Sequence, residues 1–141
     1  MTLSQSNSLD TQLATLEAAI DFTEEELLQV WAKLARETYH DFYEYMVRDE
    51  GFTMSPHQRL IGDLLMSSAS KETMRFLLSM PPGHCKSSHA SHHFPAWWFG
   101  HNPKLKFLQA GHSQGFVDNE LGAKVKQIID SEDYRRVFPG V

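Results

Sequence analysis

The chain has 141 residues and one cysteine, with 41% hydrophobic and 22% charged residues. This length suits one ordinary domain with a core. No apolar run approaches the roughly 20 residues of a membrane-spanning helix, and a single cysteine excludes an internal disulfide framework. The net charge is −5, but residues 1–50 hold 11 acids and 3 bases, whereas residues 51–141 hold 7 acids and 10 bases. The mildly basic second part suits a phosphate ligand, although ordinary scatter of surface charge explains the same balance.

The first part of the chain has a helical pattern. Apolar residues recur at three- and four-residue spacing over residues 11–48, which is typical of helices. Thr23 followed by Glu26 matches a capping box, so we expect a second helix to begin there. A further helix is predicted over residues 57–68. We therefore expect an acidic helical N-terminal segment over residues 1–50.

The apolar period changes after this segment. The run MRFLLSM, residues 74–80, is bounded by turn signals and predicts a buried strand, and KLKFLQAGHS, residues 104–113, predicts a second strand. Helices are predicted over residues 87–99 and 113–131. The order strand, helix, strand, helix favours an α/β fold with a parallel sheet. Because two strands do not make a sheet of ordinary size, we expect the domain to be incomplete.

The segment between the first predicted strand and its helix carries part of a phosphate-loop pattern. That pattern is G-x-x-x-x-G-K-[ST], and alignment on Lys86 and Ser87 puts Met80 and Cys85 at the two glycine positions. The strand–loop–helix context agrees with the chemistry, because N–H groups at a helix start attract anions. A proline-rich turn with a lysine at a helix start explains the same residues, and the Lys-Ser pair alone does not decide between the two.

An ordered series of short segments surrounds this loop. The residues of this series are Pro81, Pro82, His84, Lys86, Ser87, Phe94, Pro95, Ala96, Trp97, Asn102, Pro103, Ser113, Gln114, Tyr134, Phe138 and Pro139. Through them, residues 55–139 resemble the ATPase portion of the large subunit of tailed-phage terminases, the ATP-driven motors that package double-stranded DNA into procapsids. The resemblance implies a P-loop NTPase-like sheet with flanking helices, and ATP and Mg²⁺ as cofactors.

The resemblance also assigns roles within the loop. Lys86 would neutralise the β- and γ-phosphates, Ser87 would be the Mg²⁺ ligand, and backbone N–H groups of residues 83–88 would cradle the phosphates. Gln58 would read the adenine edge, although an exposed glutamine at a helix start is an alternative explanation. The implied cofactor-binding residues are Gly83, His84, Cys85, Lys86, Ser87, Ser88 and Gln58.

Two residues depart from the family pattern. Gly83 stands where many members have arginine, so it cannot supply the charge proposed for that group, and Cys85 stands where many have glycine. That glycine commonly takes a left-handed backbone, which a residue with a Cβ adopts at a cost of about 1–2 kcal/mol. We therefore expect Cys85→Gly to tighten nucleotide binding.

The resemblance covers only the opening of the family. No apolar strand ending in paired acids, the Walker B element, follows Lys86, and the nuclease domain is not seen. We therefore interpret residues 51–141 as a partial P-loop ATPase domain truncated before Walker B, without appreciable hydrolysis of ATP. The implied partners are double-stranded DNA, a small terminase subunit and the portal protein, in the host cytoplasm and without a membrane. The alternatives are another P-loop or helicase-like ATPase, and a non-hydrolysing fragment that only binds partner subunits.

Three other groups of residues allow a second interpretation. A histidine cluster with Cys85 is a conceivable zinc site, but a fortuitous histidine-rich face is favoured. Aromatic residues after it are favoured as core over base-stacking groups, and four lysines are favoured as a solvated face over DNA contacts. The groups are, in turn, His84, His89, His92 and His93; Trp97, Trp98 and Phe99; and Lys104, Lys106, Lys124 and Lys126.

Overall fold

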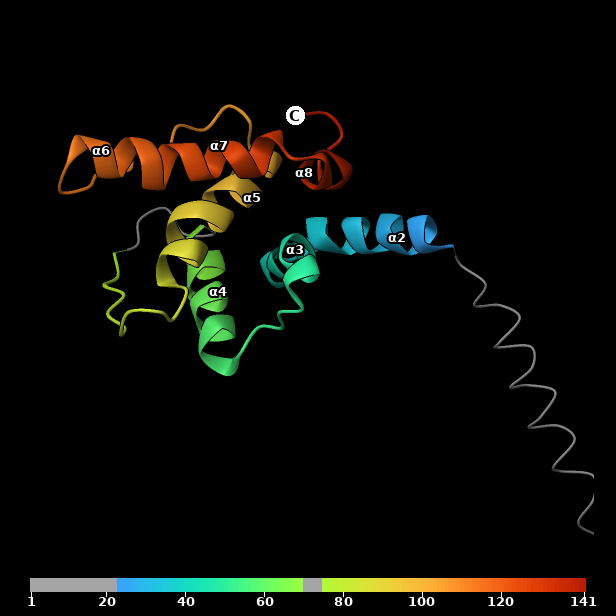
Figure 1. The fold of residues 1–141 in the computed structure, drawn as a ribbon, viewed down its shortest axis with the longest axis horizontal. Helices are drawn as coiled ribbons and strands as arrows, with labels where there is room; N and C mark the ends of the chain where they lie inside the picture. The colour runs from blue at the N-terminus through green and yellow to red at the C-terminus, as the bar shows by residue number, and fades with distance from the viewer. Residues whose placement is uncertain (1–22, 70–74) are drawn as a thin grey trace, which may run out of the picture. The chain divides into compact units, whose positions relative to one another are not determined.

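The computed structural model describes residues 23–69 and 75–141 (Figure 1). The chain divides into two compact units between Val30 and Trp31. None of the helices described is long and apolar enough to cross a membrane. The elements are α2 (Glu24–Glu37), α3 (Tyr39–Met46), the 3₁₀ turn η1 (Arg48–Glu50), α4 (Pro56–Ala69), the π-helical η2 (Ser88–His93), α5 (Phe94–His101), α6 (Gln114–Phe116), the π-helical η3 (Val117–Gly122), α7 (Ala123–Asp130) and α8 (Glu132–Val137).

The predicted parallel sheet is wrong, because the described residues form helices and contain no strand. Both segments expected to be strands are irregular where the structure describes them, and a strand exists only when a neighbouring strand accepts and donates its backbone hydrogen bonds. Leu77 and Leu108, near their centres, are 93% and 94% exposed. A short apolar run predicts burial, but it does not supply the partner that would cover it. Residue 74 of the first predicted strand lies outside the described residues.

The capping box that the sequence predicts is confirmed. Glu26 Oε2 accepts hydrogen bonds from the backbone N–H and the hydroxyl of Thr23, both at 2.8 Å, and Glu26 N–H donates to Thr23 Oγ1 at 3.3 Å. Reciprocal capping satisfies N–H groups that the first turn of a helix leaves unpaired. The two hydrogen bonds that the Glu26 carboxylate accepts from Thr23 lower the pKa of this carboxyl.

The helical pattern of residues 23–48 is divided at Thr38, which the sequence analysis did not foresee. Thr38 has an extended backbone and caps α3: its Oγ1 accepts from Asp41 N at 3.1 Å and donates to Asp41 Oδ2 at 2.6 Å. The apolar spacing continues across this cap, so periodicity alone does not reveal it. The division gives α3 its own direction and lets it enter the core.

Helix α3 forms the centre of an aromatic core. Tyr39, Phe42 and Tyr45 have no exposed surface. Tyr39 contacts the ring of Trp97 of α5 edge-on, with centroids 6.0 Å apart, and Phe42 contacts Tyr134 of α8 at 6.2 Å. Edge-to-face ring pairs of this kind stabilise a core beyond the area they bury. These ring contacts fix α5 in the core. Because α5 continues the helix that begins at Lys86, they also fix the start of that helix, directly after the loop.

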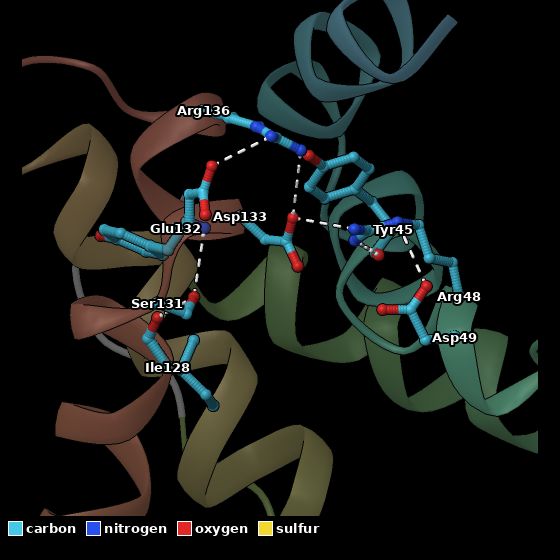
Figure 2. A network of polar contacts seen from close by, with 9 residues as sticks. Tyr45, Arg48, Asp49, Ile128, Ser131, Glu132, Asp133 and Arg136 are labelled. Atoms are coloured by element: carbon cyan, nitrogen blue, oxygen red, sulfur yellow. Dashed lines mark hydrogen bonds and ion pairs between the residues drawn. The ribbon is translucent and has the colours of Figure 1, made fainter. Parts of the chain in front are cut away.

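A network of ion pairs and hydrogen bonds joins α8 to the turn after α3 (Figure 2). Arg48 donates to Asp133 Oδ1 at 2.8 Å, and both side chains are largely buried. Ser131 caps α8 by accepting from Tyr134 N at 3.2 Å, and its hydroxyl donates to the Ile128 carbonyl at 2.6 Å. Charge-assisted bonds between partly buried groups contribute more than exposed pairs, so this network anchors the last helix.

Candidate phosphate-binding loop

The backbone of residues 81–88 turns through two left-handed residues. Gly83 has φ of 83° and Cys85 has φ of 55°, and Cys85 is the one non-glycine residue with positive φ in the part of the chain that the structure describes. A Cβ in this conformation costs about 1–2 kcal/mol. The position before Lys86 therefore has the backbone that a glycine of a phosphate loop commonly takes, although it carries a cysteine.

A helix begins directly after this turn. Lys86 and Ser87 are helical and lead into η2 and α5, which end at His101. The first bond of the helix joins His89 N–H to the Cys85 carbonyl at 3.0 Å. N–H groups that precede such a bond have no helical acceptor. The helix start therefore presents donors and the positive end of its dipole to the loop, an arrangement that favours an anion.

The side chain of Lys86 lies across the loop. Its Nζ donates to the Met80 carbonyl at 3.3 Å, and the residue is half-buried. Residues Gly83 to Ser88 line a cavity of about 300 Å³. The ammonium group is thus held next to this cavity by a single long hydrogen bond, which a phosphate oxygen can replace.

The two serines after Lys86 differ in exposure and in hydrogen bonding. Ser87 is exposed. Ser88 is half-buried, with its Oγ 3.3 Å from both Tyr43 Oη and His93 Nδ1. Of the two hydroxyls, that of Ser87 is free to meet a metal ion at the loop, whereas that of Ser88 is engaged inside the protein. Ser88 can offer a phosphate its backbone N–H alone.

Gln58 lies at the start of α4, beside the loop but not in its cavity. It is 2% exposed, and its Oε1 accepts from Ser55 N at 2.8 Å and from the Ser55 hydroxyl at 3.0 Å. The side-chain carbonyl therefore caps α4, which leaves only the amide nitrogen for an adenine. The neighbouring His57 contacts the ring of His84, with centroids 5.5 Å apart. The sequence pattern does not single out His57, although the residue directly precedes Gln58.

The histidines after the loop do not converge. His89 Nδ1 lies 2.9 Å from Tyr39 Oη, and His93 Nδ1 donates to the Ser88 carbonyl at 3.0 Å. Among the residues that the structure describes, no three His, Cys, Asp or Glu side chains are placed to hold one metal ion. The two rings are thus engaged by different partners within the protein.

The aromatic residues of α5 differ in burial. Trp97 is 6% exposed and its Nε1 donates to the Ala35 carbonyl at 3.2 Å, which places it in the core. Trp98 and Phe99 are half-buried, and Lys104, Lys106, Lys124 and Lys126 are exposed. The lysines therefore lie where solvent or a ligand can reach them.

Comparison of the chain with protein-family models, with curated proteins and with solved structures finds no match. The resemblance to terminases therefore stays a prediction drawn from the residues themselves.

Proposed function

We propose that residues 83–88 bind the phosphates of ATP with Mg²⁺, and that the chain is a nucleotide-binding part of a DNA-packaging motor related to the terminase large subunit. The observation that carries the proposal is the left-handed Cys85 directly before Lys86. A residue with a Cβ adopts this backbone at a cost, and such strain is typical of functional sites. The start of a helix and a cavity at the same residues support it.

Each residue of the loop has a distinct role in this proposal. Lys86 exchanges the Met80 carbonyl for an oxygen of the β- or γ-phosphate, and the N–H groups at the helix start donate to the phosphate that lies in the cavity. The exposed hydroxyl of Ser87 is the protein ligand for Mg²⁺, which when bound neutralises phosphate charge. Gly83 contributes a flexible backbone without a side chain in the cavity.

The partners follow from the family that the residues resemble. Double-stranded DNA, a small terminase subunit and the portal protein are the partners of such a motor, and the host cytoplasm is where it acts. The exposed Lys104, Lys106, Lys124 and Lys126, which follow α5, suit the phosphates of a DNA backbone. Binding of DNA by these lysines would depend strongly on salt.

Calorimetric titration with a non-hydrolysable ATP analogue and Mg²⁺ tests the proposal. We expect the wild-type chain to bind the analogue. Lys86→Ala should weaken binding at least tenfold, because one charge-assisted bond to phosphate contributes about 1.5–3 kcal/mol and tenfold corresponds to about 1.4 kcal/mol. Lys104→Ala, which removes an exposed lysine outside the loop, is the matched control and should bind like the wild type. Absence of binding by the wild type, or equal affinity in all three chains, would refute the proposal.

A further inference from the structure

A second cavity, apolar in character, lies between α5 and α7, which pack against each other (Figure 1). Its volume is about 350 Å³. Pro95 and Phe99 line it from α5, and Val125 and Ile129 line it from α7. Residues four apart lie on the same face of a helix. Each of the two helices therefore presents one apolar face to the cavity.

The segment between α5 and α6 forms a third wall of this cavity, although it has no regular secondary structure. Phe107 and Gln109 of this segment line the cavity. The ring of Phe107 lies against that of Phe99, with centroids 5.0 Å apart, and Gln109 Nε2 donates to the Ser91 carbonyl of η2 at 2.6 Å. One ring contact and one hydrogen bond therefore hold this wall against the helices.

The remaining wall comes from the π-helical η3. Its first and last residues, Val117 and Gly122, line the cavity, and Ala123 N–H donates to the Asp118 carbonyl five residues earlier. Turns with this hydrogen-bond pattern are rare and frequently occur at functional sites. Beyond the neighbouring backbone, the nearest atom to a Cβ on Gly122 would be the Val117 carbonyl oxygen, at an ordinary 3.8 Å. The glycine therefore leaves space in the cavity that a larger side chain would fill.

The charged group at the cavity is a lysine. Lys126 lines the cavity from α7, directly after the buried Val125, and none of the described residues that line it is acidic. In the described part of the chain, no carboxylate forms an ion pair with Lys126. An apolar cavity with a cation and without an acid is complementary to an apolar molecule that carries a negative charge.

We propose that this cavity binds a small amphipathic carboxylic acid, with its apolar body between α5 and α7 and its carboxylate at Lys126. Ligand cavities of about 300–1,000 Å³ are mostly apolar, with a few polar groups that orient the ligand. Since a dry cavity of about 150 Å³ holds benzene, the volume of about 350 Å³ suits a body of about two fused rings. The inference does not rest on nucleotide binding, because this cavity and that of the phosphate-binding loop have no residue in common.

Methyl NMR titration with naphthalene-2-carboxylate tests the site in the absence of nucleotide. We expect saturable shifts of the methyl signals of Val117, Val125 and Ile129. The uncharged naphthalene-2-carboxamide should bind about two- to fivefold more weakly, because it loses an ion pair with an exposed lysine. No saturable shift of these signals, or equal affinity for the acid and the amide, would overturn the proposal. Shifts of the same signals with protein concentration alone would show that a second copy of the chain fills the cavity, which would also overturn it.

Two substitutions test the apolar and the charged part of the site separately. Gly122→Leu should weaken binding of the acid at least about tenfold, because leucine takes the space in which the rings would be buried. Leucine also favours a helix more than glycine does, so this variant should fold. Lys126→Met removes the charge and should bind the acid no more tightly than the amide. Lys124→Met, which replaces an exposed lysine of α7 outside the cavity lining, is the matched control and should bind the acid like the wild type. Wild-type affinity of Gly122→Leu or of Lys126→Met for the acid would overturn the proposal.

Discussion

The left-handed backbone of Cys85 makes a prediction about stability that needs no ligand. Cys85→Gly removes the Cβ at φ of 55°, whereas Cys85→Ala keeps it. Both substitutions remove the sulfur of a half-buried residue. The difference between the two variants therefore isolates the backbone conformation from the loss of the thiol.

The expected difference follows from two opposing effects. A Cβ in the left-handed region costs about 1–2 kcal/mol, which glycine does not incur. Glycine increases the conformational entropy of the unfolded chain, which destabilises the folded state by about 0.4–1 kcal/mol relative to alanine. The first effect is larger, so the glycine variant should have a higher free energy of unfolding than the alanine variant, by up to about 1.5 kcal/mol.

Urea unfolding of the two variants measures this difference directly. If position 85 had an ordinary negative φ, only the entropy effect would remain, and the glycine variant would be the less stable by about 0.4–1 kcal/mol. The sign of the difference is therefore decisive. A glycine variant less stable than the alanine variant would refute the backbone conformation on which the proposed site rests.

Two further predictions concern packing. A Cβ on Gly100 would lie 2.5 Å from Cδ2 of the buried Phe138 ring, so Gly100→Ala should lower the free energy of unfolding by about 1–3 kcal/mol. Gly115→Ala is the helical control, because a Cβ there meets open space, and it should not lower this free energy. Equal effects of the two substitutions in urea unfolding would contradict the packing of Gly100 against Phe138. Asp133→Asn removes the charge paired with Arg48 at 2.8 Å and should cost about 1–2 kcal/mol, and an unchanged midpoint of thermal unfolding would show that the pair contributes nothing.

Local signals in the sequence located most of the helices. The Thr23–Glu26 pair marked the start of α2, because a capping box acts over three residues of one chain segment. The helix predicted over residues 57–68 is confirmed as α4, and the helix after the loop begins within one residue of its expected position. Each of these features is decided by neighbours in sequence.

Features decided by distant residues were not predicted. The segments around Leu77 and Leu108 have the composition of buried strands, but a strand needs a partner that composition does not specify. The short helix α8 begins at a serine cap and depends on the contact between Asp133 and Arg48, far apart in sequence.

The candidate site was predicted in part. The loop residues could be named from their order in the chain, but the contact between His57 and His84 could not, because it arises from tertiary packing. The structure gives Cys85 a φ of 55°, the left-handed backbone that the sequence predicts at this position. The tighter nucleotide binding expected of Cys85→Gly stays a prediction.

The thiol of Cys85 gives the most direct test of nucleotide binding at this loop. Cys85 is the single cysteine of the chain and lines the cavity, so its rate of modification by a thiol reagent reports on the loop alone. A bound triphosphate should cover the thiol, so we expect an ATP analogue with Mg²⁺ to slow the modification of the wild-type chain at least tenfold. Adenosine should leave the modification rate unchanged, and Lys86→Ala should lose the protection by the analogue. An unchanged rate at saturating analogue, or equal protection by adenosine, would contradict phosphate binding by residues 83–88.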